Sequence, residues 1–170
     1  MPQSPNDTIR IGIPSKGRLS ELAGELLQQA GIKYRRQNRG LFARVQGLPI
    51  DMVFLRTDDI PTLCAEGAID MGITGSDLVE EADVDVLHRM NFGVGRCRLA
   101  FCIPDDSPIQ SAAELDGKRI ATSFPSVTKH YLADRNAQAH MVALAGSVEV
   151  MIQLGVADAI VDLVETGSTL

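Results

Sequence analysis

The stretch that most constrains the fold of this chain is its end, residues 149–170. The spacing of apolar residues predicts a helix over residues 149–154, which Gly155 ends, and then a buried parallel strand at residues 159–161. Two acids and a small, hydroxyl-rich turn follow this strand: Asp162, Glu165, Thr166, Gly167, Ser168 and Thr169. Backbone N–H groups in such a turn bind a phosphate, whereas the acids accept hydrogen bonds from sugar hydroxyls or hold a cation. The stretch therefore predicts a site for a sugar phosphate.

The same stretch resembles the signature of the ATP phosphoribosyltransferase family, which opens histidine biosynthesis. The signature reads E-x5-G-x-A-x2-I-x-D-L-x2-T-G-x-T-L, and every fixed position is met here. The matching residues are Glu149, Gly155, Ala157, Ile160, Asp162, Leu163, Thr166, Gly167, Thr169 and Leu170. The alternative is an ordinary glycine-serine-threonine turn after a core strand, but a pattern of this length is far more specific than such a turn.

A basic loop follows the first predicted strand, residues 9–13. Lys16 and Arg18 lie in it, and Ser20 is the predicted N-cap of a helix over residues 21–30. Open α/β sheets bind ligands at the carboxyl ends of their strands, so the two cations are well placed for an anionic ligand. On spacing alone, a solvated loop is an equal alternative. The segment P-S-K-G-R-L, however, is similar to the lysine-glycine-arginine motif after the family's first strand.

Two further segments of the first half contain candidates. D-x-G-I-T-G-x-D, which begins at Asp70, also resembles the family, and Asp70 is a candidate for binding a ribose or amino group of ATP. A structural turn acid is the alternative. Residues 33–44 form the basic cluster of the chain, from which Arg39 is the candidate for the rim of the substrate groove; a solvated face is the alternative there.

A third resemblance lies in the second half. The passage D-G-K-R-I-A-T-S-F-P-S-V-T-K-H-Y-L is similar to one in the second lobe of type II periplasmic binding proteins. There the loop after a strand and the next helix N-terminus grip an anionic ligand. Ser123, Ser126 and Thr128 are therefore predicted as auxiliary ligand contacts, with N-capping of the helix as the alternative.

The predicted strands alternate with helices along the chain, which is the pattern of an α/β fold. The resemblance implies a two-lobed fold of the type II periplasmic-binding-protein kind, each lobe a mixed sheet flanked by helices, with the active site between the lobes. We assign residues 1–92 to lobe I and residues 93–170 to lobe II. Predicted strands at residues 84–88 and 98–103 lead from one lobe to the other. Family members continue past the signature with a segment that returns to lobe I, and we expect this segment to be absent here.

Composition narrows the possible partners and compartment. A net charge of −6 argues against a nucleic-acid surface, so an anionic substrate needs local basic residues. Cys64, Cys97 and Cys102 are odd in number and form no C-x-x-C pair, as in reduced cytoplasmic proteins. The first eight residues have no apolar signal-peptide core, and no run approaches the roughly eighteen apolar residues of a membrane span. We expect a soluble, cytoplasmic protein without a membrane partner.

The resemblance also implies the reaction and its parts. The 5-phosphoribosyl group of 5-phosphoribosyl-1-pyrophosphate (PRPP) is transferred to N1 of ATP, with Mg²⁺ as cofactor and pyrophosphate as the leaving group. By resemblance, Thr166, Gly167, Ser168 and Thr169 bind the 5-phosphate. Asp162 and Glu165 bind the ribose hydroxyls or Mg²⁺, with Glu165 as the candidate metal ligand. Lys16 and Arg18 would stabilise charge on pyrophosphate or on the phosphates of ATP.

The resemblance further implies a partner. In the family, short chains work with a separate regulatory subunit that resembles a histidyl-tRNA synthetase, and this chain matches the short form. A homodimer within a hetero-oligomer is the expected assembly. The alternative function is that of a non-catalytic solute-binding or sensor protein of the same fold. A Rossmann dehydrogenase does not fit, because G-I-P-S-K-G follows the first strand in place of G-x-G-x-x-G.

Overall fold

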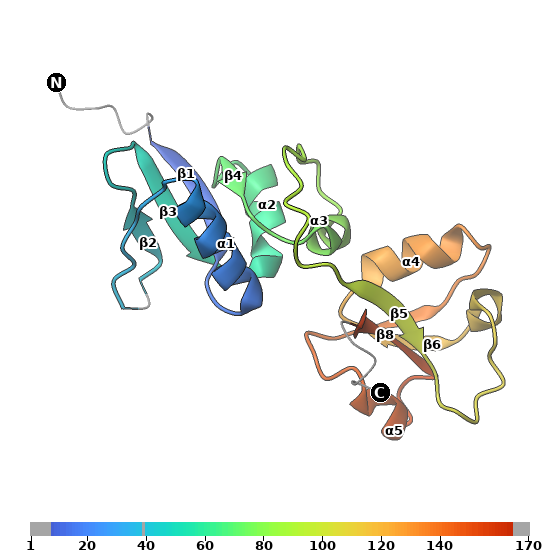
Figure 1. Cartoon of the computed structure of the whole chain (residues 1–170). Coiled ribbons are helices and arrows are strands. Elements are labelled where there is room, and N and C mark those ends of the chain that lie inside the picture. Colours follow the sequence, from blue (N-terminus) through green and yellow to red (C-terminus); the bar gives the residue numbers. More distant parts are fainter. Residues whose placement is uncertain (1–7, 39, 165–170) are drawn as a thin grey trace. The chain divides into compact units, whose positions relative to one another are not determined.

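The computed structural model describes residues 8–38 and 40–164 of the chain. The chain divides into two compact units, Met1–Phe92 and Gly93–Leu170, which we call lobe I and lobe II (Figure 1). Each lobe contains one four-stranded sheet with its own hydrophobic core.

The sheet of lobe I has the strand order β2-β3-β1-β4. The central strand β1 (Ile9–Pro14) runs parallel to β3 (Ile50–Leu55) and to the short β4 (Met71–Gly72). The edge strand β2 (Phe42–Arg44) is antiparallel to β3. All three parallel strands therefore end at one edge of this sheet.

Helices cover both faces of the lobe I sheet. On one face, Leu27 of α1 (Arg18–Gln29) shares a core with Ile13 and Phe54. On the other face, Ile60 of α2 (Ile60–Ala65) packs with Val53. The remaining elements are the 3-10 turn η1 (Thr57–Asp59) and helix α3 (Ser76–Ala82).

Lobe II repeats this plan with the order β5-β8-β6-β7. Its parallel strands are β6 (Arg119–Thr122), β7 (His140–Ala143) and β8 (Ala159–Val164), and the edge strand β5 (Arg98–Cys102) is antiparallel to β8.

Helices again lie on both faces in lobe II. Leu132 of α4 (Pro125–Ala133) packs on the face that carries Val161, next to the 3-10 turn η2 (Ala112–Leu115). Met151 of α5 (Val150–Gln153) packs on the face that carries Ile160. The prediction that each lobe is a mixed sheet flanked by helices is confirmed.

Three local predictions were wrong, each for a physical reason. The helix α1 begins at Arg18, because Gly17 (φ 83°) turns the chain directly into it and the Ser20 N–H already bonds the Gly17 carbonyl at 3.0 Å. Ser20 is thus inside the first turn rather than at the cap. The strand predicted at residues 84–88 has no pairing partner among the described residues and is not regular structure. The strand at residues 159–161 continues to Val164, because β5 pairs with residues 160–164.

Candidate functional site

The loop after β1 carries the two predicted cations of lobe I. Pro14 ends the strand in the core, and the Ser15 N–H donates to the Leu55 carbonyl at 2.7 Å, which ties the loop to β3. Lys16 and Arg18 are exposed on either side of Gly17. Arg18 is also the first residue of the twelve-residue helix α1, whose N-cap residue Gly17 has no side chain that could cap it. A helix N-terminus flanked by two cations favours an anion.

The structure brings two more loops to the same edge of the lobe I sheet. One follows β3 and begins at Arg56, whose guanidinium lies 3.4 Å from a carboxylate oxygen of Asp58. The other follows β4 and contains Thr74, whose hydroxyl donates to the Thr57 carbonyl at 3.1 Å. Sequence reasoning did not single out Arg56 or Thr74, because only the strand order β3-β1-β4 places them beside the Lys16 loop.

Asp70 lies at the opposite end of β1. Its carboxylate accepts a hydrogen bond from the Arg10 N–H at 2.8 Å, and its own N–H donates to the Arg10 carbonyl at 3.0 Å. Since β1 runs from Ile9 to Pro14, these bonds place Asp70 at the amino end of the strand. The structure therefore brings Lys16 and Arg18 together but does not bring Asp70 to them. The bonds to Arg10 are those of a structural turn acid, and a role in ATP binding stays a prediction.

The predicted ribose ligand Asp162 lies inside β8 of lobe II rather than at its end. It is half-buried, pairs with Ala100 of β5, and its Oδ1 accepts the Leu163 N–H at 2.8 Å. Burial, and then the negative charge of Asp162, raise the pKa of the nearby Cys102 thiol, so this cysteine is a neutral packing residue at pH 7.

The other predicted PRPP ligands lie outside the described residues. These are Glu165, Thr166, Gly167, Ser168 and Thr169, and the same holds for Arg39 of the basic cluster. Their assignments remain predictions from the signature and from the sequence pattern.

The pairing of β5 with β8 adds Arg98 to the site in lobe II. Arg98 stands opposite Val164, and Ala100 stands opposite Asp162. Cross-strand partners share a face of the sheet and residues two apart along a strand do too, so Arg98 and Asp162 lie on one face. Arg98 is exposed. The sequence pattern does not indicate that Arg98 and Asp162 share a face, because this depends on the register between β5 and β8.

The hydroxyl residues after β6 divide into two kinds. Thr128 is buried and its hydroxyl donates to the Phe124 carbonyl at 2.6 Å, so it is committed to the first turn of α4. The N-cap residue of α4, Phe124, makes no side-chain capping bond, and N-capping by Ser123 or Ser126 stays the alternative to a ligand contact. Ser123 and Ser126 are half-buried near the carboxyl end of β6, on the same edge as the end of β8.

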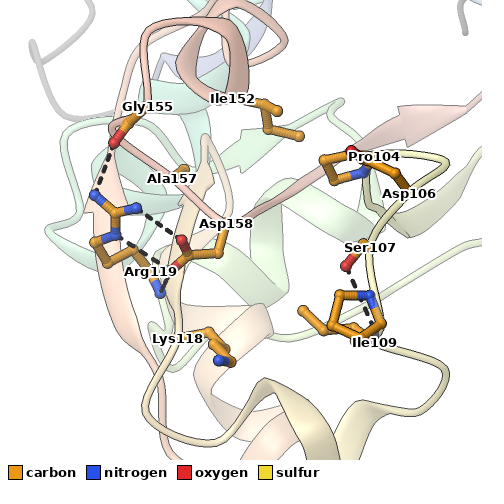
Figure 2. Close-up of a pocket in the computed structure, with 11 residues that line it drawn as sticks. Pro104, Asp106, Ser107, Ile109, Lys118, Arg119, Ile152, Gly155, Ala157 and Asp158 are labelled. Atoms are coloured by element: carbon orange, nitrogen blue, oxygen red, sulfur yellow. Dashed lines mark hydrogen bonds and ion pairs between the residues drawn. The ribbon is translucent and has the colours of Figure 1, made fainter.

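The pocket of Figure 2 lies at the other end of the lobe II sheet, where β6 and β8 begin. Arg119 opens β6 and points across to Asp158. Its Nη2 lies 2.7 Å from Oδ1, its backbone N–H donates to Oδ2 at 2.9 Å, and its Nη1 donates to the Gly155 carbonyl at 2.8 Å. The Arg119 side chain, and then its backbone N–H, lower the pKa of Asp158 to about 2. These groups satisfy one another, so they form a structural clamp rather than a substrate site.

In the part of the chain that the structure describes, no helix has the length and apolar character needed to cross a bilayer.

Comparisons with known proteins identify the family. The family model of ATP phosphoribosyltransferase matches residues 56–170. The ATP phosphoribosyltransferase of Rhodopirellula baltica is 76% identical over 166 residues, which cover 98% of this chain and 56% of that protein. The ATP phosphoribosyl transferase (HisG:HisZ) complex from Thermotoga maritima contains a chain with a TM-score of 0.81 and 31% identity, covering 96% of this chain and 77% of that one.

A more distant likeness concerns the fold alone. The periplasmic aliphatic sulphonate binding protein SsuA from Escherichia coli has a TM-score of 0.52 at 20% identity, covering 94% of this chain and 51% of that one. The predicted periplasmic-binding-protein fold is thus confirmed. The chain spans about half the length of the curated relatives it matches. On the family model and on this identity, the chain belongs to the ATP phosphoribosyltransferase family.

Proposed function

We propose that the protein transfers the 5-phosphoribosyl group of PRPP to N1 of ATP, giving phosphoribosyl-ATP and pyrophosphate in the first step of histidine biosynthesis. The observation that carries this proposal is the family match, because it runs through the whole signature at residues 149–170, including β8. Because this biosynthesis draws on the ATP and PRPP of the cytoplasm, a cytoplasmic location belongs to the proposal.

In this reaction the bond from C1 of the ribose to the pyrophosphate oxygen breaks and a bond from C1 to adenine N1 forms. Positive charge develops on the sugar and negative charge on the leaving pyrophosphate. The protein needs to align the two substrates and stabilise this charge separation, and it needs no nucleophile of its own. Lys16 and Arg18 are suited to the negative side, since they are exposed beside the N-terminus of α1. They neutralise pyrophosphate or the phosphates of ATP.

The ribose and its 5-phosphate belong to lobe II in this proposal. Asp162 is held in β8 by strand pairing and by the Leu163 N–H, so its carboxylate is oriented before the substrate arrives. It accepts a hydrogen bond from a ribose hydroxyl together with Glu165. Thr166, Gly167, Ser168 and Thr169 donate to the 5-phosphate, as the signature implies. Arg98, on the same face as Asp162, adds positive charge near the phosphates.

Mg²⁺ is also part of the proposal. Among residues 8–38 and 40–164, no three His, Cys, Asp or Glu side chains gather into a metal cage. Mg²⁺ commonly keeps several waters and is held by one or two carboxylates together with substrate phosphates. A site with Asp162 and the predicted ligand Glu165 fits this coordination. When bound, the ion neutralises charge on the leaving pyrophosphate.

The test is a direct assay of the purified chain. Phosphoribosyl-ATP formation is followed by absorbance with ATP, PRPP and Mg²⁺, and PRPP binding is measured by isothermal titration calorimetry. We expect product formation that requires both substrates, and PRPP binding that requires Mg²⁺. No product, together with preferential binding of a free amino acid or a small anion, would instead indicate a solute-binding protein.

We further propose that the chain works with a regulatory subunit resembling a histidyl-tRNA synthetase, as a homodimer within a hetero-oligomer. The support is the likeness to a chain of the Thermotoga maritima HisG:HisZ complex. We expect histidine to inhibit the purified chain barely, and to inhibit strongly once such a subunit is added. Strong inhibition of the chain by itself would rule this partner out.

A further inference from the structure

Arg36 occupies a central position in the connection between α1 and β2, and neither the signature nor the lysine-glycine-arginine motif includes it. It is half-buried. Its Nη1 donates to the Ser15 carbonyl at 2.8 Å, and its Nε donates to the Gly40 carbonyl at 2.9 Å. The guanidinium carbon lies 4.0 Å from the centroid of the Phe54 ring. One side chain thus joins the loop after β1, the loop before β2, and Phe54 near the end of strand β3.

The bond to Ser15 acts on the peptide group that leads into Lys16. The Ser15 N–H is already held by the Leu55 carbonyl at 2.7 Å, so Arg36 supplies the second anchor of this residue. The carbonyl of Ser15 and the N–H of Lys16 belong to one planar peptide unit. Holding that carbonyl therefore orients the backbone from which Lys16 projects, just before Gly17 turns the chain into α1 at Arg18.

The geometry requires an arginine. A guanidinium is a planar fork that can donate in two directions while its face lies on an aromatic ring. A lysine ammonium is a compact charge on a flexible stem, and it cannot reach both carbonyls and cover Phe54 in the same way. A change to lysine would keep the positive charge and remove the fork.

We propose that Arg36 is a positioning residue for phosphoribosyl transfer, which holds the loop carrying Lys16 and Arg18 in the conformation that meets the substrate phosphates. This inference rests on the proposed function. Arg36→Lys is expected to lower kcat by about ten- to a hundredfold, because a small displacement of catalytic groups costs rate even where the charge is kept. The KM values for PRPP and ATP are expected to change much less than kcat.

The matched control is the neighbouring Arg35, which is exposed. Arg35→Lys is expected to leave kcat and KM within about twofold of the wild type, as for an exposed charge-conserving change. A second readout is chemical rescue. Ethylguanidinium at millimolar concentration can enter the space vacated over Phe54, so it should restore part of the turnover of Arg36→Ala and leave Arg35→Ala unchanged. If Arg36 had no positioning role, ethylguanidinium would change the turnover of Arg36→Ala as little as that of Arg35→Ala.

Amide hydrogen exchange separates this inference from the proposed function, because it does not depend on catalysis. Arg36→Lys should exchange faster than the wild type at residues 15–18 and equally in β1. An active wild type whose Arg36→Lys variant keeps kcat, KM and exchange unchanged would overturn the positioning role. An inactive wild type with the same exchange difference would overturn the proposed function and still support the hold of Arg36 on the loop.

Discussion

Replacing Asp158 by asparagine tests the clamp that anchors the signature segment at the start of β8. The Arg119 side chain and backbone hold the Asp158 carboxylate, and its pKa falls from 3.8 to about 2. A lowering of that size corresponds to about 2 to 3 kcal/mol of stabilisation of the charged form. The side chains of Arg119 and Asp158 are 46% and 35% exposed, and solvent screening of such a pair leaves about 1 kcal/mol. We therefore expect Asp158→Asn to unfold with a free energy lower by about 1 kcal/mol at pH 7.

The pH dependence follows from the direction of the pKa change. A carboxyl whose folded pKa lies below its unfolded value contributes its full stabilisation above the unfolded value, and loses it as the pH falls through the folded one. The difference between wild type and Asp158→Asn should thus be constant from pH 7 to about 5, and should shrink to about half by pH 3. It should vanish only below pH 2, once the carboxyl is protonated in the folded state as well.

The assay uses urea unfolding with a reporter in lobe II. The chain has two tyrosines and no tryptophan, so a Tyr34→Phe background leaves Tyr131 of α4 as the only tyrosine. Asp105→Asn is the control, because Asp105 is an exposed acid in the same lobe. A stability difference for Asp158→Asn that stays the same at pH 7 and pH 3 would refute the account of the clamp.

Three further predictions concern the site and the core. Asp162→Asn should weaken PRPP binding by about ten- to a hundredfold, since a hydrogen bond to a charged group is lost; unchanged affinity in calorimetry would remove this assignment. Arg18→Ala should lower kcat more than it raises KM, because pyrophosphate charge grows in the transition state; steady-state kinetics showing a pure rise in KM would contradict that role. Gly72→Ala should destabilise lobe I by about 1 to 3 kcal/mol in urea unfolding, because a Cβ there meets the Ile60 side chain. Gly24→Ala, inside α1, is the control and should be neutral or stabilising, because a Cβ there meets only the Tyr34 hydroxyl at 3.8 Å, an ordinary van der Waals contact.

Several elements follow from local sequence signals. The buried strands β3 (Ile50–Leu55) and β6 (Arg119–Thr122) are encoded by short apolar runs between turn signals. Gly31 directly follows the helix predicted over residues 21–30 and ends it: this glycine has a φ of 77°, and the Ile32 N–H bonds the Leu27 carbonyl at 2.9 Å. The α/β class could be predicted from the alternation of such local signals. The family could be predicted because the signature is contiguous in the chain.

The positions of the site residues depended on contacts between distant segments. Asp162 was predicted at a strand end, but pairing with β5 extends β8 past it and brings Arg98 to the same face. Asp70 was grouped with the ATP site, yet β4 begins beside the start of β1 and places this acid at the far edge.

The sequence by itself determined the family, the alternation of strands and helices, and the loop that carries Lys16 and Arg18. Each of these depends on residues that are neighbours along the chain. Only the tertiary structure decided the strand order that gathers the loops with Arg56 and Thr74, and the hold of Arg36 on Ser15. The reason is that periodicity records which face of a strand is buried but not which strand lies beside it. Strand neighbours are selected by hydrogen bonds and packing between segments far apart in sequence.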